Sequence, residues 1–156
     1  MIARIESIDE IRPIYREYLA YISQYYDIKD YRPWRDTALE HLRRYAIEAD
    51  RYIYIVKKLR LLIGFALVNQ HLRFNTDGLA VAEFYIQKDH SRKGYGRKLA
   101  EHVFSEFSGN WEVAVTLKNS SAALFWKQVV ETYTHGKFME KRKPSFNGYG
   151  FIFNNG

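Results

Sequence analysis

The hydrophobic residues change their spacing at Arg51, and this change limits which folds the chain can adopt. Before that point apolar side chains recur every three to four residues over 10–25 and 35–48, the period of amphipathic helices. From there on, 51–56 and 61–68 have the composition and spacing of two strands joined by a short turn, which predicts a hairpin. A helical first third therefore precedes a sheet, and the sequence predicts a mixed α/β domain.

The remaining two thirds continue to alternate between strands and helices. Residues 79–87 predict a strand with mostly apolar side chains on both faces, as in a central strand, and regular alternation would place Val81, Glu83 and Tyr85 on one face. The later elements expected are a helix over 94–107, a strand over 111–117, a helix over 120–133 and strands over 136–141 and 149–153. Counting residues 1–6 as a candidate first strand, we expect one domain over 1–156. Its fold class is α/β (mixed α+β), a central twisted mixed sheet flanked by helices in the order α-α-β-β-β-α-β-α-β-β after that strand.

Composition excludes several classes of protein. The longest apolar run, 61–68, is far shorter than the roughly twenty residues of a membrane span, so no membrane partner is expected. There is no cysteine, which excludes disulfides, thiolate nucleophiles and cysteine-ligated zinc and fits a cytoplasmic protein. The five histidines have no metal-ligand spacing, and no metal is expected.

Positive charge is concentrated in one short segment. Lys plus Arg number 24 against 18 Asp plus Glu, a balance of 24 − 18 = +6 that favours anionic partners. Residues 88–98 hold five Lys or Arg and one Asp, so 5 − 1 = +4 of this charge lies there. We interpret the segment as the place where an anionic group binds.

The same segment places two glycines between a strand and a helix. Gly94 and Gly96 let a ligand approach the backbone, and the free amides of a first helical turn bind phosphate. The alternative is an ordinary turn with a solvated basic rim. A P-loop string is absent, and Leu99 stands where a dinucleotide-binding loop has its third glycine, so both of those motifs are excluded.

The segment resembles the pyrophosphate-binding motif of the GNAT superfamily of CoA-dependent N-acyltransferases. In that motif Arg or Gln, two variable residues, Gly, one variable residue and Gly or Ala follow a central strand; Gly94 and Gly96 match, whereas Ser91 replaces the Arg or Gln. Leu62–Val68 looks like the family's third strand. The resemblance covers residues 50 to 135, and the Phe125-Trp126 pair is similar to a small bacterial branch of little-characterised acetyltransferases.

The resemblance implies an N-acetyltransferase that transfers an acetyl group from acetyl-CoA to a primary amine of a small molecule or protein by direct attack. Acetyl-CoA would be a co-substrate, lying where strands 79–87 and 111–117 separate. Backbone groups of 84–86 would pair with the pantetheine and polarise the thioester carbonyl, and amides of 92–97 would hold the pyrophosphate. The implied CoA-binding residues are Phe84, Tyr85, Ile86, Ser91, Arg92, Lys93, Gly94, Tyr95, Gly96, Arg97, Asn119, Phe125 and Trp126.

Three side chains carry open alternatives. Glu83 is the candidate general base, or else a structural buried acid paired with an Arg or Tyr. Asn119 either contacts CoA or caps the helix that follows it. Trp126 stands where the family commonly has a Tyr that protonates the leaving thiolate, and indole cannot release that proton, so we expect a core or cofactor-shelf aromatic there.

The acceptor side and the partners are less constrained. The aromatic stretch 21–31 with Trp34 either lines an acceptor pocket or packs on the sheet. Competing functions are a non-catalytic acyl-CoA-binding or sensing module and a nucleic-acid binder, the second disfavoured because the charge is clustered at one loop. C-terminal strands in the family often build dimers, which makes a homodimer a further expectation.

Overall fold

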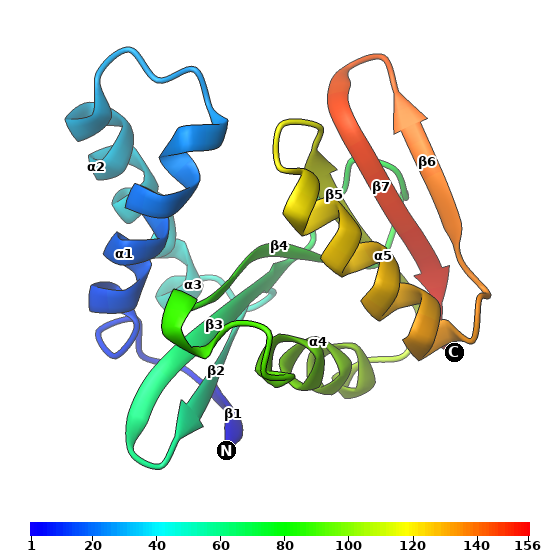
Figure 1. Cartoon of the computed structure of the whole chain (residues 1–156), viewed down its shortest axis with the longest axis horizontal. Helices are drawn as coiled ribbons and strands as arrows, with labels where there is room; N and C mark the ends of the chain where they lie inside the picture. Colours follow the sequence, from blue (N-terminus) through cyan, green and yellow to red (C-terminus); the bar gives the residue numbers. More distant parts are fainter.

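The computed structural model describes all residues 1–156 and contains one seven-stranded sheet with helices on both faces (Figure 1). The strand order is β1-β2-β3-β4-β5-β7-β6, and only β4 and β5 pair in parallel. No helix combines the length and the apolar character that crossing a membrane requires. The strands are β1 (Ile2–Ile5), β2 (Tyr52–Lys58), β3 (Leu61–Asn69), β4 (Leu79–Ile86), β5 (Asn110–Thr116), β6 (Met139–Lys143) and β7 (Phe146–Asn154). The helices are α1 (Arg12–Ile22), α2 (Tyr31–Leu42), α3 (Arg44–Ile47), α4 (Tyr95–Glu106) and α5 (Ser120–Thr134), with short 3₁₀ turns η1 (Ser23–Tyr25) and η2 (Lys88–His90).

This architecture confirms the expected fold class and element order, and the first strand is present. The main boundary error lies in the second helix, which was expected over 35–48. It begins at Tyr31 because Asp30 caps it, accepting a hydrogen bond from the Arg32 amide, and Pro33 occupies its first turn. It ends at Leu42, and a separate short helix, α3, follows. Sequence reasoning treated Pro33 as a loop residue and so missed the first turn.

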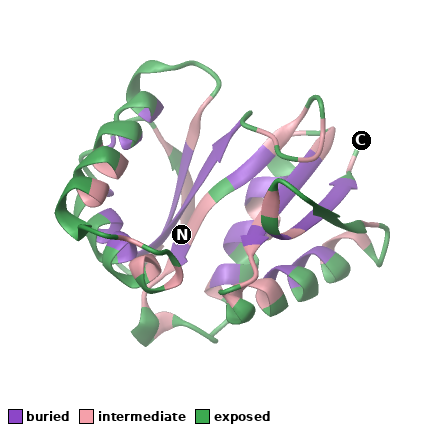
Figure 2. Cartoon of the chain, turned by 90° about the horizontal axis from the view of Figure 1, so that it is seen from above, coloured by how far each residue is buried: buried purple, intermediate pink, exposed green.

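Two hydrophobic cores lie on opposite faces of the sheet (Figure 2). One is built on α4 and α5 and includes Leu99, Phe104, Trp111 and Trp126. The other is built on α1 and α2. Its buried side chains include Tyr15, Tyr18, Leu19, Leu42, Phe65 and Tyr85. Every side chain of β4 must therefore face one of two different layers.

A bulge in β4 decides which layer each side chain faces. Leu67 on β3 pairs with Glu83, and the next residue, Val68, pairs with Val81, so Ala82 is the extra residue. Val81 consequently packs in the α4–α5 core, whereas Tyr85 packs in the α1–α2 core and Glu83 bonds a side chain of α1. The expectation that Val81, Glu83 and Tyr85 share a face is wrong, because the extra residue shifts the alternation by one.

The sheet opens between its two parallel strands. β4 and β5 pair only at Leu79 with Trp111 and at Ala80 with Glu112. Beyond Ala80, the edge of β4 that faces away from β3 has no partner strand, while β5 stays paired with β7 along its length. The two strands separate as expected from the family resemblance, and they leave an open backbone edge along the second half of β4 (Figure 1).

Candidate active site

The loop between β4 and α4 exposes backbone amides. Gly94 is the N-cap of α4 with a left-handed φ of 88°, and space is open where a Cβ would lie. The first hydrogen bond of the helix runs from the Lys98 amide to the Gly94 carbonyl at 3.1 Å. The amides of Tyr95, Gly96 and Arg97 therefore have no acceptor within the helix, which leaves them free for an anion.

The side chains of this loop play unequal parts. Ser91 uses both its amide and its hydroxyl to donate to the Lys88 carbonyl, at 3.1 and 2.8 Å, so neither group is left for a phosphate. Arg97 donates to Glu101 at 2.8 Å. Arg92 and Lys93 are exposed and form no ion pair. The anion site that this loop can form therefore consists of main-chain amides from Arg92 onward, with two exposed cations beside them.

A layer of aromatic rings lies against this loop. A Cβ on Gly96 would lie 3.1 Å from the Phe125 ring, so a larger residue would require this ring to move by a few tenths of an ångström. Phe84 contacts both Phe125, at 5.6 Å between ring centroids, and Trp126, at 4.8 Å. The Trp126 residue is 5% exposed and belongs to the α4–α5 core. Trp126 is therefore a packed core aromatic that contacts β4 through Phe84.

The start and the end of α5 are fixed by polar contacts. Asn119 is the N-cap, its side-chain oxygen accepting from the Ala122 amide at 3.1 Å. The Asn119 side chain therefore caps α5, as the second alternative proposed, and its NH₂ group has no hydrogen-bond partner in the protein. Tyr133, at the other end of α5, hydrogen-bonds Asn155 at 3.2 Å and packs on Phe104. Tyr133 lies seven residues after Trp126, roughly 10 Å along the helix axis, and does not replace the missing tyrosine at position 126.

The hydrogen bonds between β3 and β4 identify which backbone amides face the open edge of β4. The Gln87 amide donates to the Ile63 carbonyl of β3 at 2.8 Å. Because amides alternate between the two edges of a strand, the Tyr85 amide also faces β3, and the amides of Phe84 and Ile86 face the open edge. Tyr85 is thus unsuited to polarise a thioester through its amide, while Phe84 and Ile86 are oriented to do so.

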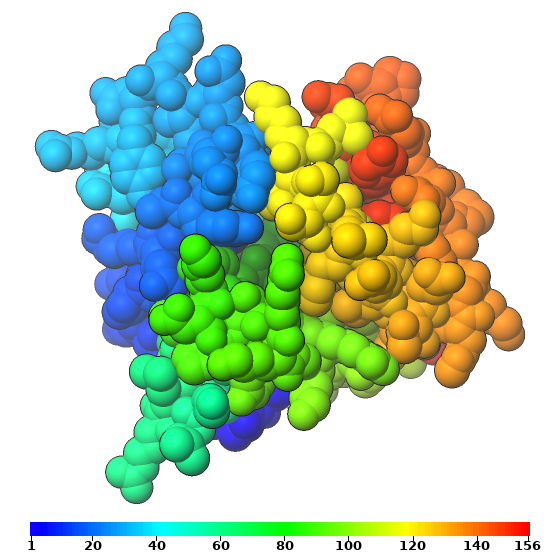
Figure 3. Space-filling view, in the orientation of Figure 1, coloured from blue at the N-terminus to red at the C-terminus, as the bar shows by residue number.

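Figure 3 shows the surface hollowed between the N-terminal helices, the loop that joins β4 to α4 and the start of α5.

Glu83 directly precedes Phe84, the first of the two amide donors on the open edge, and its side chain faces α1. Its carboxylate accepts a hydrogen bond from the Tyr15 hydroxyl at 2.8 Å. Burial raises the pKa of Glu83 to about 7, and the hydroxyls of Tyr15 and Tyr18 act in the opposite direction by stabilising the charged form. The same burial raises the pKa of Tyr15 well above its usual value, so the phenol stays a donor. A carboxyl group that titrates near neutrality is suited to accept a proton at physiological pH.

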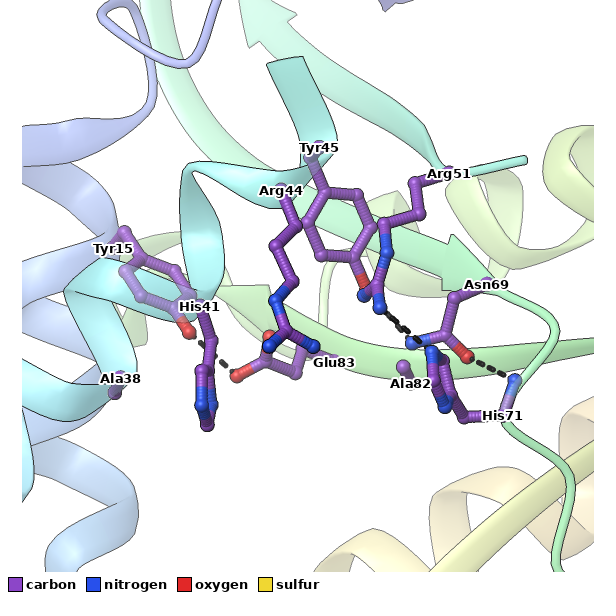
Figure 4. A pocket seen from close by; sticks show the side chains of 10 residues that line it. All are labelled: Tyr15, Ala38, His41, Arg44, Tyr45, Arg51, Asn69, His71, Ala82 and Glu83. Atoms are coloured by element: carbon purple, nitrogen blue, oxygen red, sulfur yellow. Dashed lines mark hydrogen bonds between the residues drawn. The ribbon is translucent and has the colours of Figure 1, made fainter. Parts of the chain in front are cut away.

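Two chambers open beside Glu83. The first, of about 320 Å³, is lined by two arginines and two histidines and is called the cationic chamber here. Figure 4 shows its lining side chains and their hydrogen bonds. Its remaining lining residues are aromatic, small or amide-bearing, and Glu83 is its one carboxylate. The full lining is Tyr15, Ala38, His41, Arg44, Tyr45, Arg51, Asn69, His71, Ala82 and Glu83.

The second chamber, of about 350 Å³, is mostly apolar and is called the aromatic chamber. It shares Ala38, His41, Ala82 and Glu83 with the cationic chamber. Tyr26 and Trp34 line it, so part of the aromatic stretch that the sequence associated with the acceptor side is found there. The other lining residues are Tyr18, Leu19, Ile22 and Thr37. No three side chains gather as metal ligands.

The cations of the first chamber were missed by sequence reasoning. His41, Arg44, Arg51 and His71 come from α2, α3 and the flanks of β2 and β3, and no spacing rule connects them. A second missed residue is Glu112, 1% exposed, which accepts hydrogen bonds from the amides of 73–75 at 2.7 to 3.3 Å. It holds the connection between β3 and β4, in which His71 lies. The one signal for Glu112 in the sequence was an acidic residue within an otherwise largely apolar strand.

The sequence matches the model of the acetyltransferase (GNAT) family over residues 9–129. The chain belongs to this family. Comparison with curated protein sequences gives no match.

Solved structures extend the likeness in fold to the entire chain. An acetyltransferase from Thermus thermophilus has a TM-score of 0.72 at 11% identity, covering 99% of this chain and 97% of that one. PaiA N-acetyltransferase from Thermoplasma acidophilum, in complex with coenzyme A, has a TM-score of 0.66 at 14% identity and 99% coverage of both chains. Spermidine N-acetyltransferase from Vibrio cholerae, in complex with CoA and spermine, has a TM-score of 0.67 at 10% identity, covering 99% and 95%. At these identities the GNAT fold is what the structures share.

Proposed function

We propose that this GNAT protein is an acetyl-CoA-dependent N-acetyltransferase that acetylates a primary amine by direct attack, with Glu83 as the general base. One observation carries the proposal: a part-buried carboxyl with a pKa of about 7 lies beside the open edge of β4, at the junction of two chambers. The loop with free amides follows this edge in the chain, after η2. An amine bound in the chambers and an acyl donor bound along the open edge of β4 would thus meet at one proton acceptor, Glu83.

The donor would be held mainly by backbone. Amides of 92–97 suit a pyrophosphate, with Arg92 and Lys93 adding charge, and the open edge of β4 suits the amide chain of pantetheine. Binding of CoA or acetyl-CoA in the neighbours from Thermoplasma acidophilum and Salmonella typhimurium supports this assignment. Phe84 or Ile86 would donate to the thioester oxygen, a contribution of about 3 kcal/mol for one donor.

The chemical step would need only one proton acceptor in the protein. The amine lone pair forms the new C–N bond, the C–S bond breaks, and the thiolate leaves with the electron pair. Glu83 accepts the proton that the attacking nitrogen loses. Because the chain has no cysteine, a cysteine acyl-enzyme is excluded. A thiol pKa of about 8.5 lets the thiolate leave without a dedicated acid, which accommodates Trp126.

Binding and turnover test the proposal separately. Acetyl-CoA should raise the midpoint of thermal unfolding, since a ligand at 100 times its Kd adds about 2.7 kcal/mol to the free energy of unfolding. Thiol release in the presence of primary amines, with mass spectrometry of the product, should show one acetyl group per thiol. Absence of stabilisation by millimolar acetyl-CoA would refute the proposal.

A second function is supported by Trp126, which removes the usual proton donor. On that basis a non-catalytic acyl-CoA-binding module is the competing proposal. It predicts stabilisation by acetyl-CoA with no thiol release above the buffer rate for any amine. The same two measurements therefore separate the two functions.

A further inference from the structure

The charges around Glu83 set the kind of amine that fits beside it. Arg44 lines the cationic chamber and has no carboxylate within ion-pair distance. Figure 4 shows Arg44 among the side chains that line the same chamber as Glu83. Glu83 is the one acid of the lining, and its raised pKa leaves it partly neutral at pH 7. The chamber therefore presents one arginine, Arg44, whose charge is not paired with a carboxylate.

Neighbouring contacts hold the rest of this wall in place. The Arg51 side chain is 9% exposed, is paired with Glu48, donates to His71 Nε2 at 2.6 Å and lies over the Tyr45 ring. The Arg51 guanidinium lowers the pKa of Glu48, so this pair is ionised. Arg51 is thus committed to protein partners and fixes the shape of the wall. Arg44 is the arginine left to bind a substrate.

The opposite side of Glu83 has a different chemistry. The aromatic chamber, with Tyr26 and Trp34, shares the floor of Ala38, Ala82 and Glu83 with the cationic chamber. A substrate amine at Glu83 would have one substituent directed toward Arg44 and another toward the two aromatic rings. One carbon that carries an amine, a carboxylate and an apolar side chain matches these three directions.

We propose that the acceptor is an α-amino acid with a large apolar side chain, its amine at Glu83, its carboxylate on Arg44 and its side chain in the aromatic chamber. The proposal rests on the proposed N-acetyltransferase function and specifies its substrate class. An arginine binds a carboxylate with two charge-assisted hydrogen bonds, and a flat apolar group packs well on aromatic rings. The carboxylate makes Arg44 a specificity-determining contact.

The same charges disfavour a polyamine. Spermine, bound in the neighbour from Vibrio cholerae, carries several positive charges, and those beyond the reacting amine would meet the unpaired charge of Arg44 in the cationic chamber. A like charge without a compensating acid is unfavourable in a partly buried site. The acceptor of this chain is expected to differ from that of this structural neighbour.

A matched set of amines tests the carboxylate and the apolar group separately. With the full chain and acetyl-CoA, L-phenylalanine should exceed L-phenylalaninamide, L-alanine and spermidine by at least tenfold in kcat/KM, measured by thiol release and product mass. The amide keeps the ring and the amine, and its amine loses a proton more readily because no negative charge is nearby. A preference for the acid would therefore arise from the chamber and not from amine reactivity.

Variants at two adjacent positions connect the preference to Arg44. Arg44→Gln should raise KM for phenylalanine at least tenfold while leaving the amide unchanged, and Arg44→Lys should restore part of the loss. Arg43→Gln is the control, since Arg43 is exposed, pairs with Glu40 and lines neither chamber. Equal effects of the two Gln variants would overturn the assignment of Arg44.

The outcomes for the substrate class and for the enzyme function differ. If spermidine or the amide is acetylated as efficiently as phenylalanine, the amino-acid proposal is wrong and the N-acetyltransferase function stands. If acetyl-CoA binds and no amine releases thiol, the N-acetyltransferase function is wrong, and the amino-acid proposal falls with it.

Discussion

The two sides of β4 are built from different parts of the polypeptide. The loop before α4 presents main-chain amides, with φ of 88° at Gly94 and a buried Gly96, and its side chains matter little for its shape. The two chambers beside Glu83 are made of side chains from α1, α2, α3 and β3. Backbone recognition suits a donor common to many relatives, whereas side chains suit an acceptor particular to this one. Mutations on the two sides should therefore affect different kinetic constants.

The largest expected effect is the loss of the proposed base, Glu83, on the proposed acceptor side. Glu83→Gln should lower kcat by about 10²- to 10⁴-fold, because the variant cannot accept the proton of the amine. Burial raises the pKa of Glu83 to about 7, so kcat/KM of the wild type should rise with pH through an inflection near 7 that the variant lacks. Kinetics from pH 5.5 to 9 measure both effects.

Affinity for CoA is the control for this variant. Calorimetry should give the same Kd for wild type and Glu83→Gln, since the carboxylate faces α1 and not the loop. Unchanged turnover at pH 7 would make Glu83 a structural acid. A parallel loss of CoA affinity would show that the two sides are not independent.

The same residue has a smaller effect on stability, with a sign set by its pKa. Because the pKa of Glu83 is raised in the folded protein, the free energy of unfolding falls as the pH rises from about 4.3, the pKa of the group in the unfolded chain, through 7. Glu83→Gln should therefore be more stable than wild type by about 1–3 kcal/mol at pH 8 and nearly equal to it at pH 4.5. Urea unfolding at the two pH values measures the difference. A variant less stable at pH 8 would contradict the raised pKa.

On the proposed donor side, reversing the charge of Lys93 should affect the binding of CoA alone. Lys93→Glu should weaken CoA binding at least tenfold, because a carboxylate would stand beside the proposed phosphates, and should leave the pH inflection near 7 in place. Lys58→Glu, an exposed lysine at the end of β2, is a matched control. Unchanged affinity in Lys93→Glu would remove Lys93 from the site.

The smallest expected effect separates capping from ligand binding at Asn119. Because its side chain caps α5, Asn119→Ala should lower the free energy of unfolding by about 1 kcal/mol and leave the Kd of CoA within twofold. Asn119→Ser, which keeps a capping oxygen, should recover most of the stability. A fivefold loss of CoA affinity with little change in stability would instead make Asn119 a ligand.

The contrast between the two sides also explains what the sequence could predict. The position of the loop between β4 and α4 was predictable because it depends on local features, a strand end followed by two glycines within 88–98. Glu83 was identified as a buried acid on a central strand, yet its face was assigned wrongly, because the bulge at Ala82 depends on pairing with β3 and leaves no local mark. Ser91 was expected at the phosphates and instead hydrogen-bonds Lys88.

The cationic chamber was not predictable for a related reason. Its arginines and histidines lie up to 30 positions apart in the chain, and α3 is too short to show a pattern. Only packing of α1 and α2 on the sheet brings them around Glu83. The start of α2 at Tyr31 was misjudged because Pro33 was assigned to the preceding loop, although proline is well tolerated in a first turn.

The extra residue in β4 has a consequence for the position of Glu83. Deleting Ala82 would leave Val81 and Glu83 as consecutive residues opposite Val68 and Leu67, so regular alternation would keep Glu83 on the α1 side. If Ala82 stayed and paired without a bulge, Glu83 would instead share the face of Val81, toward the α4–α5 core and out of both chambers. The position of this carboxyl therefore depends on how β4 pairs with β3 as well as on which residues β4 contains.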